Sequence, residues 1–186
     1  STGAFAITVL AASTVCHLPT RTIRRMVFDN PRMGGDAREN AARLLVTPGG
    51  LMELSPADAR EVVGFMRPKR VPSGSVLIRE GEAADVDAMM LILEGEVTVE
   101  YEVASPHETM VVSILGPGGL IGEMGLLDGS PRSATCTAVT DLAGSVLTRD
   151  ALRQFSYACP DVAARLLLSI STRLSDRLRE SNRKLR

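Results

Sequence analysis

The sequence predicts a mainly β fold: an antiparallel β-roll of the jelly-roll type, flanked by an N-terminal helical segment and a long C-terminal helix. Short apolar runs separated by glycine and proline clusters recur between residues 70 and 148, which is typical of an antiparallel barrel or jelly roll. After residue 160 the apolar residues recur at helical spacing instead. With 45% hydrophobic residues over 186 positions, the chain can fill a core.

Residues 1–50 are expected to form a partly helical extension, with short helices at about 20–28 and 36–46. The apolar run from Ala4 to Ala12 is about half as long as a bilayer span. No Lys or Arg precedes this run, so neither a membrane span nor a signal peptide is predicted. Pro48-Gly49-Gly50 is expected to break the chain before the main domain, residues 51–186.

The domain is expected to begin with a helix from Ser55-Pro56, an N-cap followed by a proline at the first helical position, to about Met66. The roll itself is placed at residues 70–148. Its predicted strands are Val76–Ile78, two strands between Met89 and Tyr101 that meet at a Glu94-Gly95-Glu96 turn, Met110–Leu115, Arg132–Val139 and Leu142–Leu147.

Two helices are predicted after the roll, at 149–158 and 160–185. The second carries an apolar stripe at helical spacing. The stripe consists of Leu167, Ile170, Leu174 and Leu178. These side chains are expected to pack, either against the roll or against a second copy of the chain.

The charge distribution excludes several classes of function. Residues 80–148 contain twelve acidic side chains and one basic side chain, Arg132. Such an acidic body repels nucleic acid, so no nucleic acid is expected as a partner. The chain has no Trp and two Tyr, which also argues against base-stacking platforms. Three dispersed cysteines without a C-x-x-C pair favour a reducing, cytoplasmic compartment.

One segment combines residue types that suit a nucleotide. Glycines at 118, 119, 122 and 125 let backbone approach a ligand closely, and a helical turn near Glu123 would aim free N–H groups at an anion. Arg132 offers a planar charged fork to phosphate oxygens, Ser133 adds a hydroxyl, and Ala134 leaves the backbone uncrowded. Glu123 would repel phosphate, but it suits a sugar hydroxyl beside the phosphate.

Gly122-Glu123 and Arg132-Ser133-Ala134, at this spacing, resemble the phosphate-binding cassette of the cyclic nucleotide-binding domain family. That family includes the β-roll of catabolite activator protein, kinase regulatory subunits and cyclic-nucleotide-gated channels. Upstream segments around Val71–Gly74 and Ile78–Glu82 also match, so the resemblance covers about residues 50–186.

The resemblance implies a role for each residue of the cassette. Glu123 would bind the ribose 2′-hydroxyl, and Arg132 and Ser133 would hold the cyclic phosphate. Backbone N–H groups at Gly122, Glu123 and Ala134 would assist them. The long C-terminal helix would close over the purine and pair with the same helix of a second chain.

Two positions depart from the family pattern. Ile121 replaces a frequent Phe, which is an apolar exchange. Arg177-Leu178 stands where catabolite activator protein has a Thr-Ser pair that reads adenine, so adenine specificity is less secure. Arg177 is instead expected to lie on the purine face, as in channel-type members. The overall prediction is a non-catalytic cyclic nucleotide sensor that favours cAMP over cGMP, needs no other cofactor and controls a partner protein.

Three alternatives remain at this point. A transcription factor of the catabolite activator type needs a helix-turn-helix after the long helix, and the sequence ends at Arg186, where that module would begin. A degenerate roll would dimerise without ligand, with Glu123 and Arg132 as a structural ion pair. A metal-dependent enzyme is disfavoured because His17 and His107 are the only two histidines.

Overall fold

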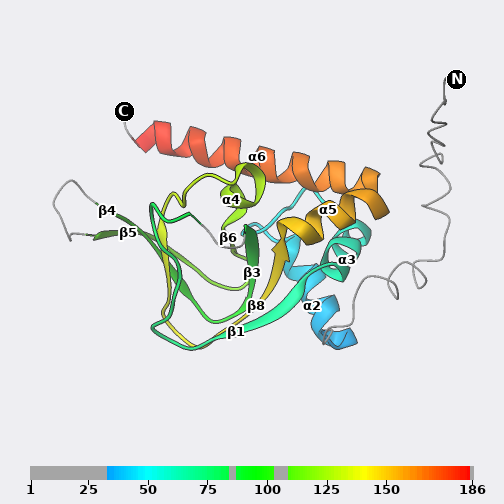
Figure 1. The fold of residues 1–186 in the computed structure, drawn as a ribbon, viewed down its shortest axis with the longest axis horizontal. Helices are drawn as coiled ribbons and strands as arrows, with labels where there is room; N and C mark the ends of the chain where they lie inside the picture. The colour runs from blue at the N-terminus through cyan, green and yellow to red at the C-terminus, as the bar shows by residue number, and fades with distance from the viewer. Residues whose placement is uncertain (1–32, 84–86, 103–108, 185–186) are drawn as a thin grey trace, which may run out of the picture. The chain divides into compact units, whose positions relative to one another are not determined.

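The computed structural model describes residues 33–83, 87–102 and 109–184, which belong to one compact unit from Arg32 to Arg186 (Figure 1). The predicted helix at 20–28, the run from Ala4 to Ala12, Cys16, His17 and His107 lie outside the described residues.

Two four-stranded antiparallel sheets form the body, which confirms the predicted β-roll. The strand order is β1-β8-β3-β6 in one sheet and β2-β7-β4-β5 in the other. The strands are β1 (Arg67–Val71), β2 (Val76–Ile78), β3 (Ala88–Glu94), β4 (Val97–Glu102), β5 (Thr109–Leu115), β6 (Leu120–Ile121), β7 (Thr135–Ala138) and β8 (Leu142–Thr148). Apolar side chains from both sheets pack together inside the roll, including Met90, Ile92, Val97 and Cys136.

Strand β3 is buried along most of its length, which explains its continuous apolar sequence. Met90 and Ile92 belong to the cluster inside the roll. Met89 and Leu91 alternate with them and are also fully buried. Because successive side chains of a strand point to opposite faces, these two lie on the outer face of the sheet, where helices cover it.

Five helices accompany the sheets in the described part of the chain. They are α2 (Gly35–Leu45), α3 (Pro56–Gly64), α4 (Glu123–Asp128), α5 (Arg149–Ala158) and α6 (Pro160–Lys184). The Ser55 hydroxyl accepts a hydrogen bond from the Asp58 amide at 3.1 Å, as expected for an N-cap. Phe65 and Phe155 join the helical layer, with ring centroids 4.9 Å apart. Helix α2, which precedes residue 50, packs against α3, which follows it. The domain boundary at residue 50 stays a prediction.

One predicted strand boundary needs correction, and two strands were missed. The strand predicted from Arg132 begins only at Thr135, because Arg132, Ser133 and Ala134 belong to the loop that precedes it. Strands β1 and β6 were not predicted. Strand β1 lies at a sheet edge, where charged side chains and Pro68 are tolerated, so its sequence lacks apolar alternation.

Within the single chain, the predicted apolar stripe of α6 is fully buried only at Ile170. Ala163, Leu166 and Ile170 form the buried face, whereas Leu167 and Leu178 are exposed. Helix α6 runs along one side of the roll past α4 (Figure 1). Among the described residues, no helix is both long and apolar enough to cross a membrane.

Candidate functional site

A left-handed glycine places Glu123 at the start of α4. Gly122 follows β6 directly and has φ 79°, a conformation that L side chains rarely adopt. A Cβ at this position would also lie only 2.6 Å from the carbonyl oxygen of Ala88. The chain therefore turns from β6 into α4 within one residue, and Glu123 becomes the first helical residue.

Arg132 is held in the same region by its backbone and its side chain. Its amide donates to the Glu82 carbonyl at 3.0 Å, and its own carbonyl accepts from the Gly81 amide at 2.8 Å. Its Nη1 donates to the Gly122 carbonyl at 3.3 Å. The guanidinium lies against Gly125, where a Cβ would collide with Nη1. Arg132, the one basic residue between positions 80 and 148, is thus held beside the first turn of α4.

These residues line one open pocket. All six residues predicted for the ligand line this pocket: Gly122, Glu123, Arg132, Ser133, Ala134 and Arg177. Apolar side chains from the strands complete the wall, namely Ile78, Val99, Leu115, Leu120 and Ile121, together with Tyr101 and Cys136. The pocket thus combines an apolar wall with a few convergent polar groups, as small-molecule sites do.

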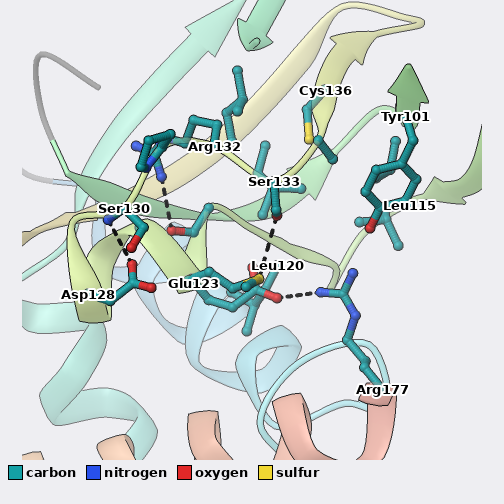
Figure 2. A pocket seen from close by; sticks show the side chains of 18 residues that line it. Tyr101, Leu115, Leu120, Glu123, Asp128, Ser130, Arg132, Ser133, Cys136 and Arg177 are labelled. Atoms are coloured by element: carbon teal, nitrogen blue, oxygen red, sulfur yellow. Dashed lines mark hydrogen bonds and ion pairs between the residues drawn. The ribbon is translucent and has the colours of Figure 1, made fainter. Parts of the chain in front are cut away.

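Glu123 is already paired inside this pocket. Its side chain is only 3% exposed, and Oε1 accepts a hydrogen bond from Arg177 Nη1 at 2.5 Å. Figure 2 shows the two side chains pointing toward one another, Glu123 from α4 and Arg177 from α6. The ion pair of Glu123 is therefore formed with the C-terminal helix, whereas the alternative considered from sequence paired it with Arg132.

Arg173 lies one helical turn before Arg177 and was not singled out from the sequence. Its Nη1 donates to the Gly50 carbonyl at 3.3 Å, and its buried Nε has no hydrogen-bond partner among the described residues. Burial lowers the pKa of Arg173, and the nearby negative charge of Glu123 opposes that shift. One arginine of α6 thus binds the buried carboxylate of Glu123, and a second contributes positive charge nearby.

Arg149 supports the far end of α4 and was also missed. Its Nη2 donates to the Gly125 carbonyl at 2.8 Å and lies 3.2 Å from Oδ2 of Asp87. Gly129 caps the C-terminal end of the helix, and a Cβ there would lie 3.0 Å from Nη1 of Arg149. Arg149 therefore ties the C-terminal end of α4 to the chain before β3.

Two smaller side chains complete the site. Ser133 is exposed, and its hydroxyl donates to the Met124 sulfur at 3.5 Å. Cys136 lies in the pocket wall, where burial, followed by the charge of Glu123, raises the pKa of its thiol to about 11. Among the described residues, no cluster of His, Cys, Asp or Glu could hold a metal ion.

Comparison with known proteins agrees with this architecture. Residues 68–156 match the model of the cyclic nucleotide-binding domain. A cyclic nucleotide-binding domain from Methylobacillus flagellatus superposes with a TM-score of 0.67 and is 30% identical, covering 80% of this chain and 82% of that one. This chain belongs to the cyclic nucleotide-binding domain family.

Two curated relatives are larger proteins. A cyclic nucleotide-gated potassium channel of Rhizobium etli is 38% identical over 60% of this chain and 29% of its own length. A CRP-like cAMP-activated global transcriptional regulator of Mycobacterium tuberculosis is 27% identical over 70% of this chain and 57% of its own length. The chain therefore spans less than two thirds of either protein.

Proposed function

We propose that this chain binds a cyclic nucleotide, with cAMP favoured over cGMP, and acts as a regulatory sensor without catalysis. The observation that carries this proposal is the convergence of Glu123 and Arg132 on one pocket, next to the turn made by Gly122. A carboxylate and a guanidinium at this spacing match a ligand that has both a sugar hydroxyl and a phosphate. The cAMP-activated relative supports the choice of ligand.

Each pocket residue takes one part of the ligand in this proposal. Arg132 and Ser133 hold the cyclic phosphate, and the backbone N–H groups of Gly122, Glu123 and Ala134 donate to it. Glu123 accepts the ribose 2′-hydroxyl. The purine lies against the apolar wall formed by the strands, with no other cofactor in the site.

Closure of α6 is the proposed response to the ligand. Arg177 already reaches the pocket from this helix, so a small movement would lay its guanidinium on the purine face. The ligand shifts the equilibrium only as far as it binds the closed state better than the open state. This difference in affinity is the proposed signal to a regulated partner protein.

A homodimer through α6 is the proposed assembly, in the cytoplasm and without nucleic acid bound by these residues. Leu167, Leu168 and Leu178 are exposed on that helix and would be covered by the partner helix. The transcription-factor alternative would place this sensor inside a longer protein. The degenerate alternative would keep the dimer and bind no nucleotide.

Isothermal titration with cAMP and with cGMP tests the proposal. We expect saturable binding of cAMP, and a loss of at least tenfold in affinity for Arg132→Ala, because hydrogen bonds to charged groups contribute roughly 1.5–3 kcal/mol each. Arg153→Ala is the matched control, since Arg153 is exposed on α5 and outside the pocket. Absence of heat and of thermal stabilisation at millimolar cAMP and cGMP would contradict the proposal.

A further inference from the structure

Glu123 is occupied by a group of the protein itself. Arg177 Nη1 binds Oε1 of Glu123 at 2.5 Å, at the carboxylate that the proposed function assigns to the ribose 2′-hydroxyl. Glu123 is 3% exposed, whereas the side chain of Arg177 is 48% exposed. The carboxylate is therefore the fixed, buried member of the pair, and the arginine approaches from the solvent side.

A buried carboxylate is costly to leave without a donor. Removing one partner of a buried polar pair costs the desolvation free energy of the remaining group, and more when that group is charged. Glu123 must therefore have a donor both with and without ligand. In the ligand-free pocket that donor is Arg177. Arg173 contributes a second positive charge from the preceding helical turn, but its Nη1 donates to the Gly50 carbonyl.

We propose that Arg177 determines how strongly the site discriminates ribose from 2′-deoxyribose, because it competes with the sugar 2′-hydroxyl for Glu123. This inference rests on the proposed function. A cyclic ribonucleotide displaces Arg177 and supplies the hydroxyl donor in its place. A 2′-deoxynucleotide has no such donor, so Arg177 stays on Glu123 and the carboxylate remains satisfied.

Arg177 therefore reduces the penalty for a missing hydroxyl. Without this side chain, a ribonucleotide still satisfies Glu123, but a 2′-deoxynucleotide leaves the carboxylate buried with no donor from the ligand or from position 177. The ratio of the two dissociation constants should then rise. The two ligands have the same base, and Arg177 can contact the purine only after it leaves Glu123. Loss of that contact would weaken the ribonucleotide alone and lower the ratio, so a rise of the ratio reports the effect at the sugar.

The test is isothermal titration of cAMP and 2′-deoxy-cAMP into wild type, Arg177→Ala, Arg177→Lys and Arg179→Ala. We expect Arg177→Ala to raise the ratio of Kd for 2′-deoxy-cAMP to Kd for cAMP by about tenfold, the effect of one unsatisfied buried acceptor. Arg177→Lys keeps a charged donor and should retain a ratio near that of wild type. Arg179→Ala removes an equal charge from α6 at an exposed ion pair with Asp176 and should not change the ratio.

A second comparison uses Glu123→Gln as the background. There the negative charge is absent and a neutral amide oxygen remains as the acceptor, so adding Arg177→Ala should raise the ratio less than it does in wild type. An equal ratio in wild type and Arg177→Ala, or the same rise in both backgrounds, would overturn the competition while leaving nucleotide binding intact. Failure of wild type to bind either ligand would overturn the proposed function as well, so the two failures are distinguishable.

Discussion

Arg165 of α6 forms a bidentate ion pair with Asp58 at the start of α3: Nε lies 2.9 Å from Oδ2, and Nη2 lies 2.7 Å from Oδ1. The same helix reaches the ligand pocket three turns later through Arg177. The first half of α6 is thus attached to the helical layer, while its second half contacts the cassette. The closure proposed for α6 would therefore involve its second half, with the first half held by Asp58.

The Asp58–Arg165 pair should make the stability of the domain depend on acid pH. The hydrogen bonds from Arg165 hold the pKa of Asp58 below its ordinary value. A carboxylate with a lowered folded-state pKa contributes stability above its unfolded pKa of about 3.9, and this contribution disappears as pH falls through the folded value. Asp58→Asn should lower the Tm by a few degrees at pH 7, and the difference from wild type should shrink below about pH 4.

Thermal unfolding followed by circular dichroism between pH 3 and pH 7 measures this effect. Glu39→Gln is the matched control, because Glu39 forms a similar pair with Arg60 on an exposed surface, where ion pairs contribute little. A difference between wild type and Asp58→Asn that stays constant over the whole pH range would show that the ion pair is not the source of the stability.

Gly125→Ala should separate ligand binding from folding. Alanine favours a helix more than glycine does, by about 1 kcal/mol, so the fold should be retained. The new Cβ would collide with the Arg132 guanidinium and displace it from the pocket. We expect the affinity for cAMP to fall about tenfold or more, since a charged hydrogen bond is lost, while the Tm without ligand is unchanged or higher.

Titration calorimetry and thermal unfolding of the same preparations test the Gly125 prediction. Gly116→Ala serves as the control, because a Cβ at Gly116 meets no atom within 4 Å. An unchanged affinity in Gly125→Ala would mean that the ligand does not need Arg132 where the structure places it.

The site residues were predictable where they lie close together in the sequence. Gly122-Glu123 and Arg132-Ser133-Ala134 combine residue types with few other uses, and both segments line the pocket as expected. The strands were predictable where glycine and proline mark their ends and one face is buried. Strand β1 was not, because it pairs at an edge and exposes most of its side chains.

The contacts between distant parts of the chain were not predictable. Arg177 was identified as a site residue, but its pairing with Glu123 spans 54 positions and depends on the path of α6 across the roll. The sequence gives weaker indications of the contacts that Arg149 and Gly125 make. A basic residue opening a helix is electrostatically unfavourable, and a glycine inside a short helix often marks a close approach of other atoms.

Arg149 should support the cassette from outside the pocket. Arg149→Ala removes the hydrogen bond to the Gly125 carbonyl and the ion pair with Asp87, so the C-terminal end of α4 loses its attachment. We expect a fall of about threefold to tenfold in cAMP affinity, because one hydrogen bond contributes about 1 kcal/mol. Titration of Arg149→Lys, which retains the charge but not the planar fork, should give an intermediate affinity. A wild-type affinity for Arg149→Ala would show that α4 needs no such attachment.

Cys136 should report occupation of the pocket without being reactive itself. Because its thiol pKa is raised to about 11, roughly one molecule in a thousand carries the thiolate at pH 8, and the side chain is buried. Cys159 is less buried and serves as an internal control.

Iodoacetamide labelling at pH 8, followed by mass spectrometry of the separate peptides, should therefore modify Cys159 faster than Cys136. Saturating cAMP should slow the labelling of Cys136 further, because the ligand covers the pocket wall, and leave Cys159 unchanged. Equal slowing at both cysteines would instead indicate a general stabilisation of the fold, and no slowing at Cys136 would place the nucleotide away from this wall.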